Sequence, residues 1–172
     1  MNTSITIRIA KPDDAYENAV CHVSSWRSAY KGIIPDEYLN NLSIEERAEK
    51  FKRYLKESKE YEWYSAFYEN RITGILSIGK SRDEDKPNAG EIIGFYFIEE
   101  LWGKGCGKKM MDFATSRLNN IGYNKIILWV LEENHRARRF YEKCGFLFDG
   151  TKKEITIGKP LIEIRYELNL LQ

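Results

Sequence analysis

The segment Lys125–Leu131 constrains the fold most strongly, because its sequence, KIILWVL, is almost entirely apolar. A strand with apolar side chains on both faces is typical of the centre of a sheet that is covered on both sides. Other layers must therefore pack on each face of the sheet that contains it. A chain of 172 residues is long enough to supply those layers, and we expect residues 1–172 to form one domain.

Hydrophobic periodicity and turn residues predict the elements around this strand. In chain order the predicted elements are a strand at residues 5–9, helices at residues 12–32 and from residue 35 to about Lys59, a hairpin at residues 61–69 and 72–80 with Asn70 and Arg71 between its strands, a strand at 91–98, a helix that ends at Gly122, the strand Lys125–Leu131, a helix at 134–144, and closing strands around 146–153 and 161–168. Ser43 and Glu46 form a capping-box pattern within the second helical region. This order predicts a mixed sheet with helices on both faces, which is an α/β layered fold.

The charge balance excludes partners that are recognised mainly through a strong electrostatic field. The chain carries 27 basic and 26 acidic residues, a formal net charge of +1, so no global field attracts nucleic acid or anionic lipid. No apolar stretch approaches the roughly 18–20 residues that a membrane span needs, and the first residues lack the pattern of a signal peptide. We therefore expect no nucleic-acid partner and no membrane partner.

The cysteine pattern indicates the compartment. Cys21, Cys106 and Cys144 are odd in number and widely spaced, without a C-x-x-C motif, and the chain has only two histidines. This pattern argues against a disulfide framework and against a zinc site. We expect a reducing, cytoplasmic location and no metal.

The segment LWGKGCGKKMMDF, residues 101–113, places three glycines within five positions directly before an amphipathic helix. It does not fit the dinucleotide fingerprint G-x-G-x-x-G, because Lys108 occupies the position of the third glycine. It does not fit the P-loop G-x-x-x-x-G-K-[ST] either, because Trp102 and Lys109 stand at the first glycine and at the hydroxyl position. Both nucleotide motifs are therefore excluded.

The start of the following helix leaves one ligand-binding interpretation. The first N–H groups of a helix have no partners within it. Without side chains at Gly103, Gly105 and Gly107, a pyrophosphate could approach those groups and the positive end of the helix dipole. Lys104 and Lys108 could add positive charge. The alternative is a glycine-rich connecting turn with solvated lysines.

A second segment, NHRARRFYEKCGF at residues 134–146, identifies a family when it is taken together with the first. Residues 102–108, WGKGCGK, are similar to the acetyl-CoA loop Q/R-x-x-G-x-G/A of the GNAT superfamily of N-acetyltransferases, although Trp102 stands where that family usually has Gln or Arg. The second segment matches the family signature N-x-x-A-x-x-F-Y-x-K-x-G-F at each specified position, which are Asn134, Ala137, Phe140, Tyr141, Lys143, Gly145 and Phe146. The chain therefore resembles a GNAT protein over essentially its whole length.

This resemblance implies a fold and an activity. The fold is a mixed, mostly antiparallel central sheet of about seven strands with helices on both faces. The activity is transfer of an acetyl group from acetyl-CoA to a primary amine of a small molecule or peptide, by direct attack in a ternary complex that leaves CoA as product. Two alternatives stay open: an acyl-CoA-binding sensor without catalysis, and a ping-pong reaction in which Cys106, among helix N-terminal amides, carries the acyl group.

The resemblance also implies which residues bind the cofactor. The loop residues are Trp102, Gly103, Lys104, Gly105, Cys106, Gly107 and Lys108. The pantetheine arm is expected beside Phe95, Tyr96 and Phe97, where a bulge and a splayed neighbouring strand leave main-chain groups unpaired, with the Phe97 amide as donor to the thioester oxygen. Asn134 is predicted to cap its helix and, by resemblance, to bond the pantetheine amides. Three arginines could reach the 3′-phosphate or form a solvated helix face: Arg136, Arg138 and Arg139.

Two side chains are expected to carry proton transfer. An alkylamine has a pKa near 10, so only about one molecule in a thousand is a free nucleophile at pH 7. The resemblance makes Glu91 the general base that removes the amine proton, often through water; the alternative is an acid that ends a strand. The resemblance also makes Tyr141 the expected general acid, a role that suits a phenol because it stays protonated at neutral pH and can donate to the departing thiolate. The alternative for Tyr141 is an ordinary amphipathic tyrosine.

The first two helices usually form the acceptor side in this family. Trp26 and Tyr30 are therefore candidate substrate-binding residues, whose rings could stack on a ligand or surround an ammonium group. At helical spacing both could equally belong to the core. The closing strands could support a homodimer, because exposed sheet edges invite pairing.

Overall fold

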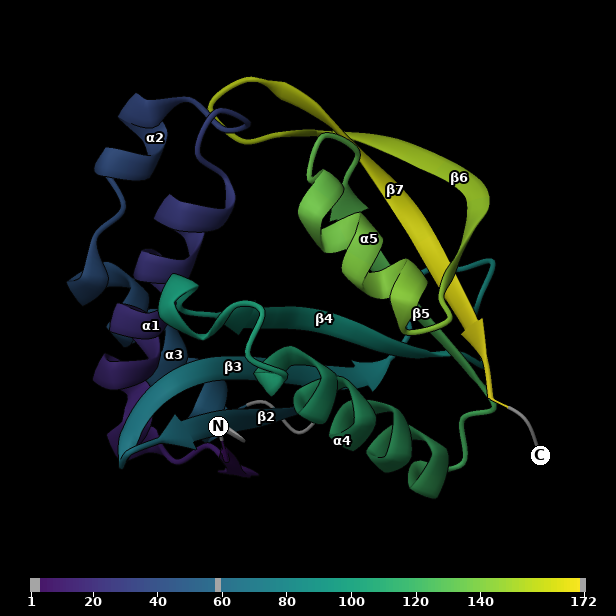
Figure 1. Ribbon diagram of the computed structural model, residues 1–172, viewed down its shortest axis with the longest axis horizontal. Coiled ribbons are helices and arrows are strands. Elements are labelled where there is room, and N and C mark those ends of the chain that lie inside the picture. The colour runs from purple at the N-terminus through teal and green to yellow at the C-terminus, as the bar shows by residue number, and fades with distance from the viewer. Residues whose placement is uncertain (1–3, 58–59, 171–172) are drawn as a thin grey trace.

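A seven-stranded sheet forms the centre of the computed structural model, which describes residues 4–57 and 60–170 (Figure 1). Its strands are β1 (Thr6–Ile9), β2 (Tyr61–Tyr68), β3 (Arg71–Lys80), β4 (Gly90–Phe97), β5 (Lys125–Leu131), β6 (Leu147–Thr156) and β7 (Pro160–Asn169). They lie in the order β1-β2-β3-β4-β5-β7-β6, and neighbouring strands run antiparallel except β4 and β5, which are parallel. The prediction of a mixed, mostly antiparallel sheet of about seven strands is confirmed.

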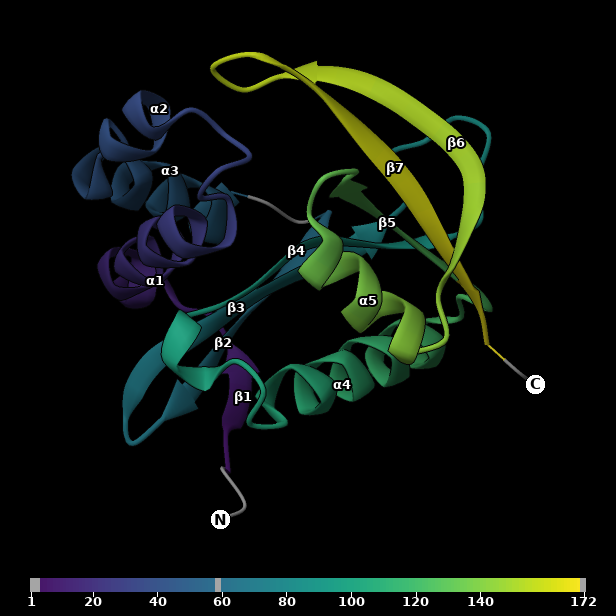
Figure 2. The ribbon, with the colours of Figure 1, turned by 45° about the horizontal axis from the view of Figure 1, so that its top comes forward.

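Helices cover both faces of this sheet, as predicted (Figure 2). They are α1 (Ala15–Ala29), α2 (Asp36–Asn40), α3 (Ile44–Glu57), α4 (Cys106–Ile121) and α5 (His135–Lys143), with short 3-10 turns at Pro12–Asp14 and Glu99–Leu101. Adjacent residues of β3 show the two layers: Ile75 packs with α1 and α3, whereas Leu76 packs with α4. None of the helices in the described ranges is long and apolar enough to cross a membrane.

Local signals set the starts of two helices. The Ser43 hydroxyl oxygen accepts the Glu46 amide at 3.1 Å at the start of α3. The Asn134 side chain accepts the Ala137 amide at 3.2 Å at the start of α5, so both helices have the N-terminal cap that their sequences predict. The predicted end of the α3 region near Lys59 lies outside the described residues.

The β2–β3 hairpin turns one residue earlier than predicted. Its turn residues are Glu69 and Asn70, and Arg71 already belongs to β3. Both turn residues have positive φ, 49° and 62°, as the two-residue turn that matches strand twist requires. Asn adopts this left-handed conformation more readily than Arg does, which explains why the turn includes Asn70 and leaves Arg71 extended.

Strand β5 lies where its apolar sequence predicts, in the interior of the sheet between β4 and β7. The side chains of Ile126, Ile127 and Leu128 are buried, although successive residues point to opposite faces. Both faces of β5 are therefore covered, as the composition of this strand indicates. The outer strand on this side of the sheet is β6, and pairing between two copies of the chain through this edge stays a prediction.

The contact between β4 and β5 is short, and this opens the sheet. Only residues 90–92 of β4 pair with residues 126–128 of β5. The register of β4 against β3 then shifts at Ile93, which forms a bulge. Beyond this point β4 and β5 separate, so main-chain groups on one edge of β4 face the gap instead of a neighbouring strand.

Candidate functional site

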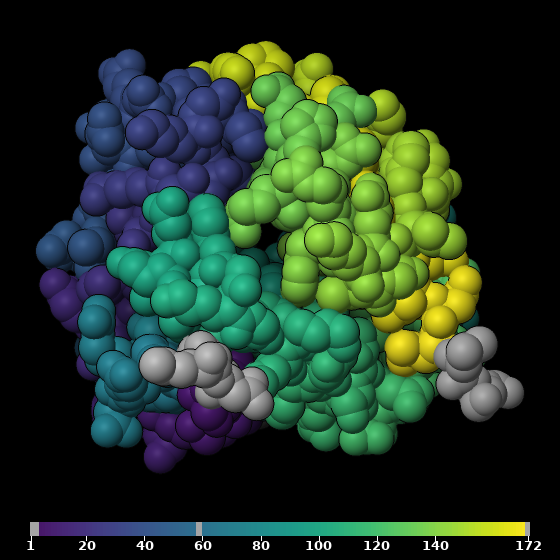
Figure 3. Space-filling model, in the orientation of Figure 1, coloured from purple at the N-terminus to yellow at the C-terminus, as the bar shows by residue number. Residues whose placement is uncertain are grey.

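A cavity of about 590 Å³ lies at the gap between β4 and β5. Figure 3 shows it as a hollow between α5 and the segment that follows β4. We call one part of it the α5 side, which is lined by Phe95, Phe97, Trp102, Gly103, Gly105, Gly107, Asn134, Arg136 and Tyr141. We call the other part the α1 side, which is lined by Trp26, Tyr30, Glu91, Tyr96 and Glu163. The cavity thus reaches residues that pack with the helices on each face of the sheet.

The glycine segment turns the chain from β4 into α4 through two residues in the left-handed region. Gly103 has a φ of 72°, and Gly105, the N-cap of α4, has a φ of 83°, where other residues are strained. A Cβ at either position would meet no atom within 4 Å, so this backbone faces open space. The first N–H groups of α4 lack partners inside the helix and lie at the positive end of its dipole. This arrangement suits a phosphate group.

The other residues of the segment have different surroundings. A Cβ at Gly107 would lie 3.3 Å from the ring of Phe140, so this glycine lets α4 approach α5 closely. Lys108 lines the cavity and forms an ion pair with Asp112 one helical turn later. Lys104 is exposed and does not line the cavity. The absence of a side chain therefore permits close packing at Gly107, and it permits the left-handed backbone conformation at Gly103 and Gly105.

Cys106 is the first residue of α4, and its side chain is fully buried. Burial raises the pKa of its thiol, which opposes formation of the thiolate that an acyl-cysteine route requires. The side chain does not line the cavity. Residues 4–57 and 60–170 contain no group of three His, Cys, Asp or Glu side chains that could hold a metal ion.

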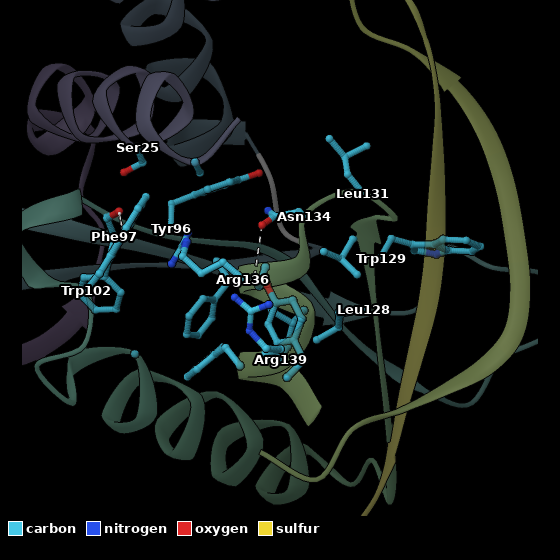
Figure 4. Close-up of a pocket in the computed structure, with 18 of the residues that line it drawn as sticks. Ser25, Tyr96, Phe97, Trp102, Leu128, Trp129, Leu131, Asn134, Arg136 and Arg139 are labelled. Atoms are coloured by element: carbon cyan, nitrogen blue, oxygen red, sulfur yellow. Dashed lines mark hydrogen bonds between the residues drawn. The ribbon is translucent and has the colours of Figure 1, made fainter. Parts of the chain in front are cut away.

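Trp102 connects two walls of the α5 side (Figure 4). Its indole N–H donates to the Phe97 carbonyl at 3.0 Å, and the guanidinium carbon of Arg136 lies 3.5 Å from the centre of its ring. Burial lowers the pKa of Arg136, but a guanidinium stays charged in proteins. A guanidinium stacked on a ring keeps the N–H donors in its own plane available for an anion. The residue that departs from the family pattern thus holds a cation inside the cavity.

Tyr141 lies on the α5 side among aromatic rings. The ring of Phe95 is 6.3 Å away and that of Phe146 is 6.2 Å away. Burial raises the pKa of Tyr141, so the phenol keeps its proton across the neutral range and can donate it in a hydrogen bond. Asn134 is also buried in the cavity wall, and its oxygen accepts the helix-capping bond. Its NH₂ group is the part of the side chain that remains for a ligand.

Glu91 lies on the α1 side, where it is 1% exposed. Its Oε1 accepts from the Arg82 guanidinium at 2.6 Å, and its Oε2 accepts from the Arg82 amide at 2.9 Å. The Glu91 carboxylate in turn raises the pKa of Arg82. Both oxygens are therefore occupied, and direct proton transfer from an amine to Glu91 requires Arg82 to give up at least one bond.

Trp26 and Tyr30 have features of both predicted roles. They line the cavity, and they also pack against the buried cluster that contains Leu131. Their rings are 5.0 Å apart in an edge-to-face arrangement, and the Trp26 ring is 6.4 Å from that of Tyr96. Burial raises the pKa of Tyr30 and of Tyr96. The α1 side therefore presents aromatic rings with neutral hydroxyl groups.

Sequence reasoning missed the charged residues that support the α1 side. Arg165 of β7 is 3% exposed, and it donates hydrogen bonds of 2.6–2.8 Å to the carboxylates of Asp83, Asp85 and Asp149. The Trp129 indole N–H also donates to Asp83 at 3.0 Å. These bonds attach the loop between β3 and β4 to β5 and β7.

The sequence carried only a weak signal for this network. Glu163, Arg165 and Glu167 alternate along the last strand, a pattern that is also typical of a solvent-exposed face. Arg82 belongs to a polar segment that the sequence marks only as a loop. Because the partners are about eighty positions apart, no local motif brings Arg165 and Asp83 together.

Comparisons with known proteins agree with this geometry. Residues 26–146 match the family described as the acetyltransferase (GNAT) family. The uncharacterized N-acetyltransferase YuaI of Bacillus subtilis is 32% identical over an alignment of 165 residues that covers 91% of this chain and 93% of that protein. The spermine/spermidine N(1)-acetyltransferase of Bacillus subtilis is 33% identical over an alignment of 103 residues that covers 56% of this chain and 68% of that protein.

A solved structure shows the same fold. The crystal structure of the PaiA N-acetyltransferase from Thermoplasma acidophilum in complex with coenzyme A matches with a TM-score of 0.74 at 23% sequence identity. The match covers 96% of this chain and 99% of that chain.

Proposed function

The chain belongs to the GNAT family of acetyltransferases, and on that premise we propose that it transfers an acetyl group from acetyl-CoA to a primary amine of a small molecule or peptide, by direct attack in a ternary complex. The observation that carries the proposal is the cavity at the gap between β4 and β5. It presents bare backbone at a helix start on the α5 side and aromatic and carboxylate groups on the α1 side. Two substrates could therefore meet from opposite faces of the sheet.

The α5 side fits acetyl-CoA. The open backbone at Gly103 and Gly105 leaves the first amides of α4 accessible to a pyrophosphate. Main-chain groups at residues 95–97 face the gap and can bond the amides of a pantetheine arm, as an added strand would. The NH₂ group of Asn134 and the guanidinium of Arg136 supply further donors. When bound, acetyl-CoA supplies the acetyl group as a thioester.

Three groups of the chain would assist the reaction. Phe97 belongs to the half of β4 that has no partner in β5, and its N–H would donate to the thioester oxygen. Tyr141 holds a proton that it can donate to the leaving sulfur. Glu91 would accept the proton of the amine through a water molecule, since its oxygens are already bonded to Arg82.

The second candidate is an acyl-CoA-binding sensor without catalysis. One observation favours it: the carboxylate that the reaction would use as a base is occupied by Arg82 on both oxygens. In that case the α5 side would bind the cofactor and the α1 side would not take part in chemistry. We further propose a cytoplasmic location, for which the three free cysteines are suitable.

A panel of primary amines, with spermidine, n-butylamine, lysine and a short peptide among them, tests the proposal. The purified protein is mixed with acetyl-CoA and each amine, and released thiol is measured. We expect thiol release that depends on at least one amine. Tight acetyl-CoA binding with no amine-dependent release from any member supports the sensor instead.

Glu91→Gln then separates the role of this carboxylate from its bonds to Arg82. As a general base, Glu91 contributes about a hundredfold to kcat, so the variant should lose about that factor while the KM for acetyl-CoA stays unchanged. Arg82→Gln is the matched control, since it removes the guanidinium bonds to Glu91 and keeps both the carboxylate and its bond from the main-chain amide of residue 82. Full activity of Glu91→Gln would show that Glu91 is not the base.

A further inference from the structure

The α1 side of the cavity contains two carboxylates with different surroundings. Glu91 is 1% exposed and bonded to Arg82 through both oxygens. Glu163 of β7 keeps 22% of its side chain exposed, and its ion pair with Lys153 is long, with 3.4 Å between Nζ and Oε2. Among the cavity-lining side chains, Glu163 is thus the carboxylate with the most remaining capacity to accept hydrogen bonds from a ligand.

Aromatic groups line the same cavity as this carboxylate, and Glu163 pairs across the sheet with Leu131, against whose cluster Trp26 and Tyr30 pack. Burial is the main cause of the raised pKa of Tyr30 and of Tyr96, and the negative charge of Glu163 is a smaller cause for both. Both tyrosine rings line the cavity with Trp26. A carboxylate beside aromatic faces attracts a cation in two ways, through its charge and through the ring quadrupoles.

Glu163 already contacts one alkylammonium group, that of Lys153. Its Nζ lies 3.8 Å from the centre of the Trp129 ring while it contacts Glu163. Figure 4 shows Trp129 beside β7, at the end of the cavity away from Trp102. The Lys153 side chain is 41% exposed, so its ion pair contributes little to stability, and another ammonium group can replace it at Glu163.

We propose that Glu163 binds the ammonium group of the acceptor amine, with Tyr30, Tyr96 and Trp26 around it. The inference rests on the proposed function and names its acceptor class. The preferred acceptors are amines with a net positive charge, and amines that carry a carboxylate near the amino group are disfavoured. A carboxylate on the acceptor would face the charge of Glu163 and be repelled. Lys153 competes with the acceptor for the same oxygen atoms.

Two substitutions with opposite expected effects test the proposal. Glu163→Gln keeps the shape of the side chain but removes the charge, and should raise the KM for spermidine by about ten- to a hundredfold, as expected for one hydrogen bond between charged groups. Lys153→Met removes the competing cation and should lower that KM by about two- to fivefold. Neither should change the KM for acetyl-CoA. Glu154→Gln, on the exposed face of β6, is the control and should change nothing.

The sign of the two effects decides the outcome. If Glu163→Gln and Lys153→Met both raise the KM for spermidine, the ion pair only supports the cavity wall, and the proposal is wrong. If the wild type releases no thiol with any amine, calorimetric titration of spermidine into the CoA-saturated protein replaces the kinetic measurement. Binding that Glu163→Gln weakens then supports this site although the proposed reaction fails, whereas equal binding or no binding overturns it. Melting temperatures confirm that each variant is folded.

Discussion

The two sides of the cavity are built in different ways. The α5 side uses backbone: two glycines with positive φ, the first amides of α4 and the edge of β4 that has no partner in β5. The α1 side uses charged side chains that meet from distant segments, such as Arg82 with Glu91, and Arg165 with the β3–β4 loop. Backbone geometry hardly depends on pH or salt, whereas ion pairs depend on both. The α1 side should therefore be the more easily disturbed and the more easily altered in evolution.

The largest effect is expected at Tyr141, on the α5 side. Tyr141→Phe removes the hydroxyl proton and should lower kcat by about a thousandfold, within the range for general acid catalysis. The dissociation constant of CoA should change little, because the ring and its aromatic neighbours remain. Stopped-flow or steady-state thiol release measures kcat, and calorimetry measures CoA binding.

The pH profile tests the same residue. A raised pKa means that Tyr141 stays in its acid form at pH values where an ordinary phenol begins to ionise. The wild type should therefore show no loss of kcat from this group between pH 7 and about 9. A descending limb in that range that disappears in Tyr141→Phe would contradict the assignment.

The next effect concerns the support of the α1 side. Arg165→Met leaves three carboxylates without their common cation and should lower the free energy of unfolding by about 3 kcal/mol. This value is at the low end of the destabilisation expected when one partner of a buried ion pair is removed, because Asp85 is exposed and can be hydrated. Chemical denaturation measures the change. Lys152→Met, which breaks an exposed ion pair with Glu132, is the control and should leave the free energy of unfolding almost unchanged.

Acid should reveal the same network. Hydrogen bonds from Arg165 lower the pKa of Asp85, and burial opposes them with a smaller effect. Burial also acts to raise the pKa of Asp149, but hydrogen bonds from Thr151 and Arg165 lower it overall. A carboxyl with a lowered folded-state pKa stabilises the protein above its unfolded pKa, and this contribution is lost as pH falls through the folded value. Wild-type stability should therefore decrease below about pH 4. The decrease should be shallower in Arg165→Met, and equal slopes would contradict the role of this network.

A smaller effect is expected in the glycine segment. Gly105→Ala places a side chain at a φ of 83° without any steric contact, which strains the backbone by about 1–2 kcal/mol. Gly150→Ala is a matched control, because its φ of 91° and its open surroundings are similar and it does not line the cavity. Both variants should lose similar stability, but only Gly105→Ala should weaken CoA binding, by about tenfold. Equal CoA affinity in the two variants would remove this loop from the binding site.

The contrast between the two sides also explains what the sequence could predict. The apolar strand β5, the helix caps and the glycine segment depend on neighbours in the chain, so periodicity and motifs locate them. The open gap follows from only three residue pairs between β4 and β5, and the resemblance implied it. The contacts of Arg165 and Glu163 depend on which strands lie side by side after folding, so the sequence shows charged residues without their partners.

The smallest effect is expected at Trp102, where the α5 side depends on side chains after all. Trp102→Gln restores the residue type that the family usually has, but removes the ring on which Arg136 stacks. The stack is worth about 0.5–1 kcal/mol, so CoA affinity should fall by about threefold if Arg136 is held there for an anion. Trp102→Phe keeps a ring and loses the hydrogen bond to the Phe97 carbonyl, so this variant separates the contribution of the stack from that of the hydrogen bond.

The double variant tests whether Trp102 acts through Arg136. In the background of Arg136→Gln, Trp102→Gln should have no further effect on CoA affinity. An undiminished loss in that background would mean that Trp102 acts through Phe97, and tighter CoA binding by Trp102→Gln alone would mean that the stack obstructs the cavity.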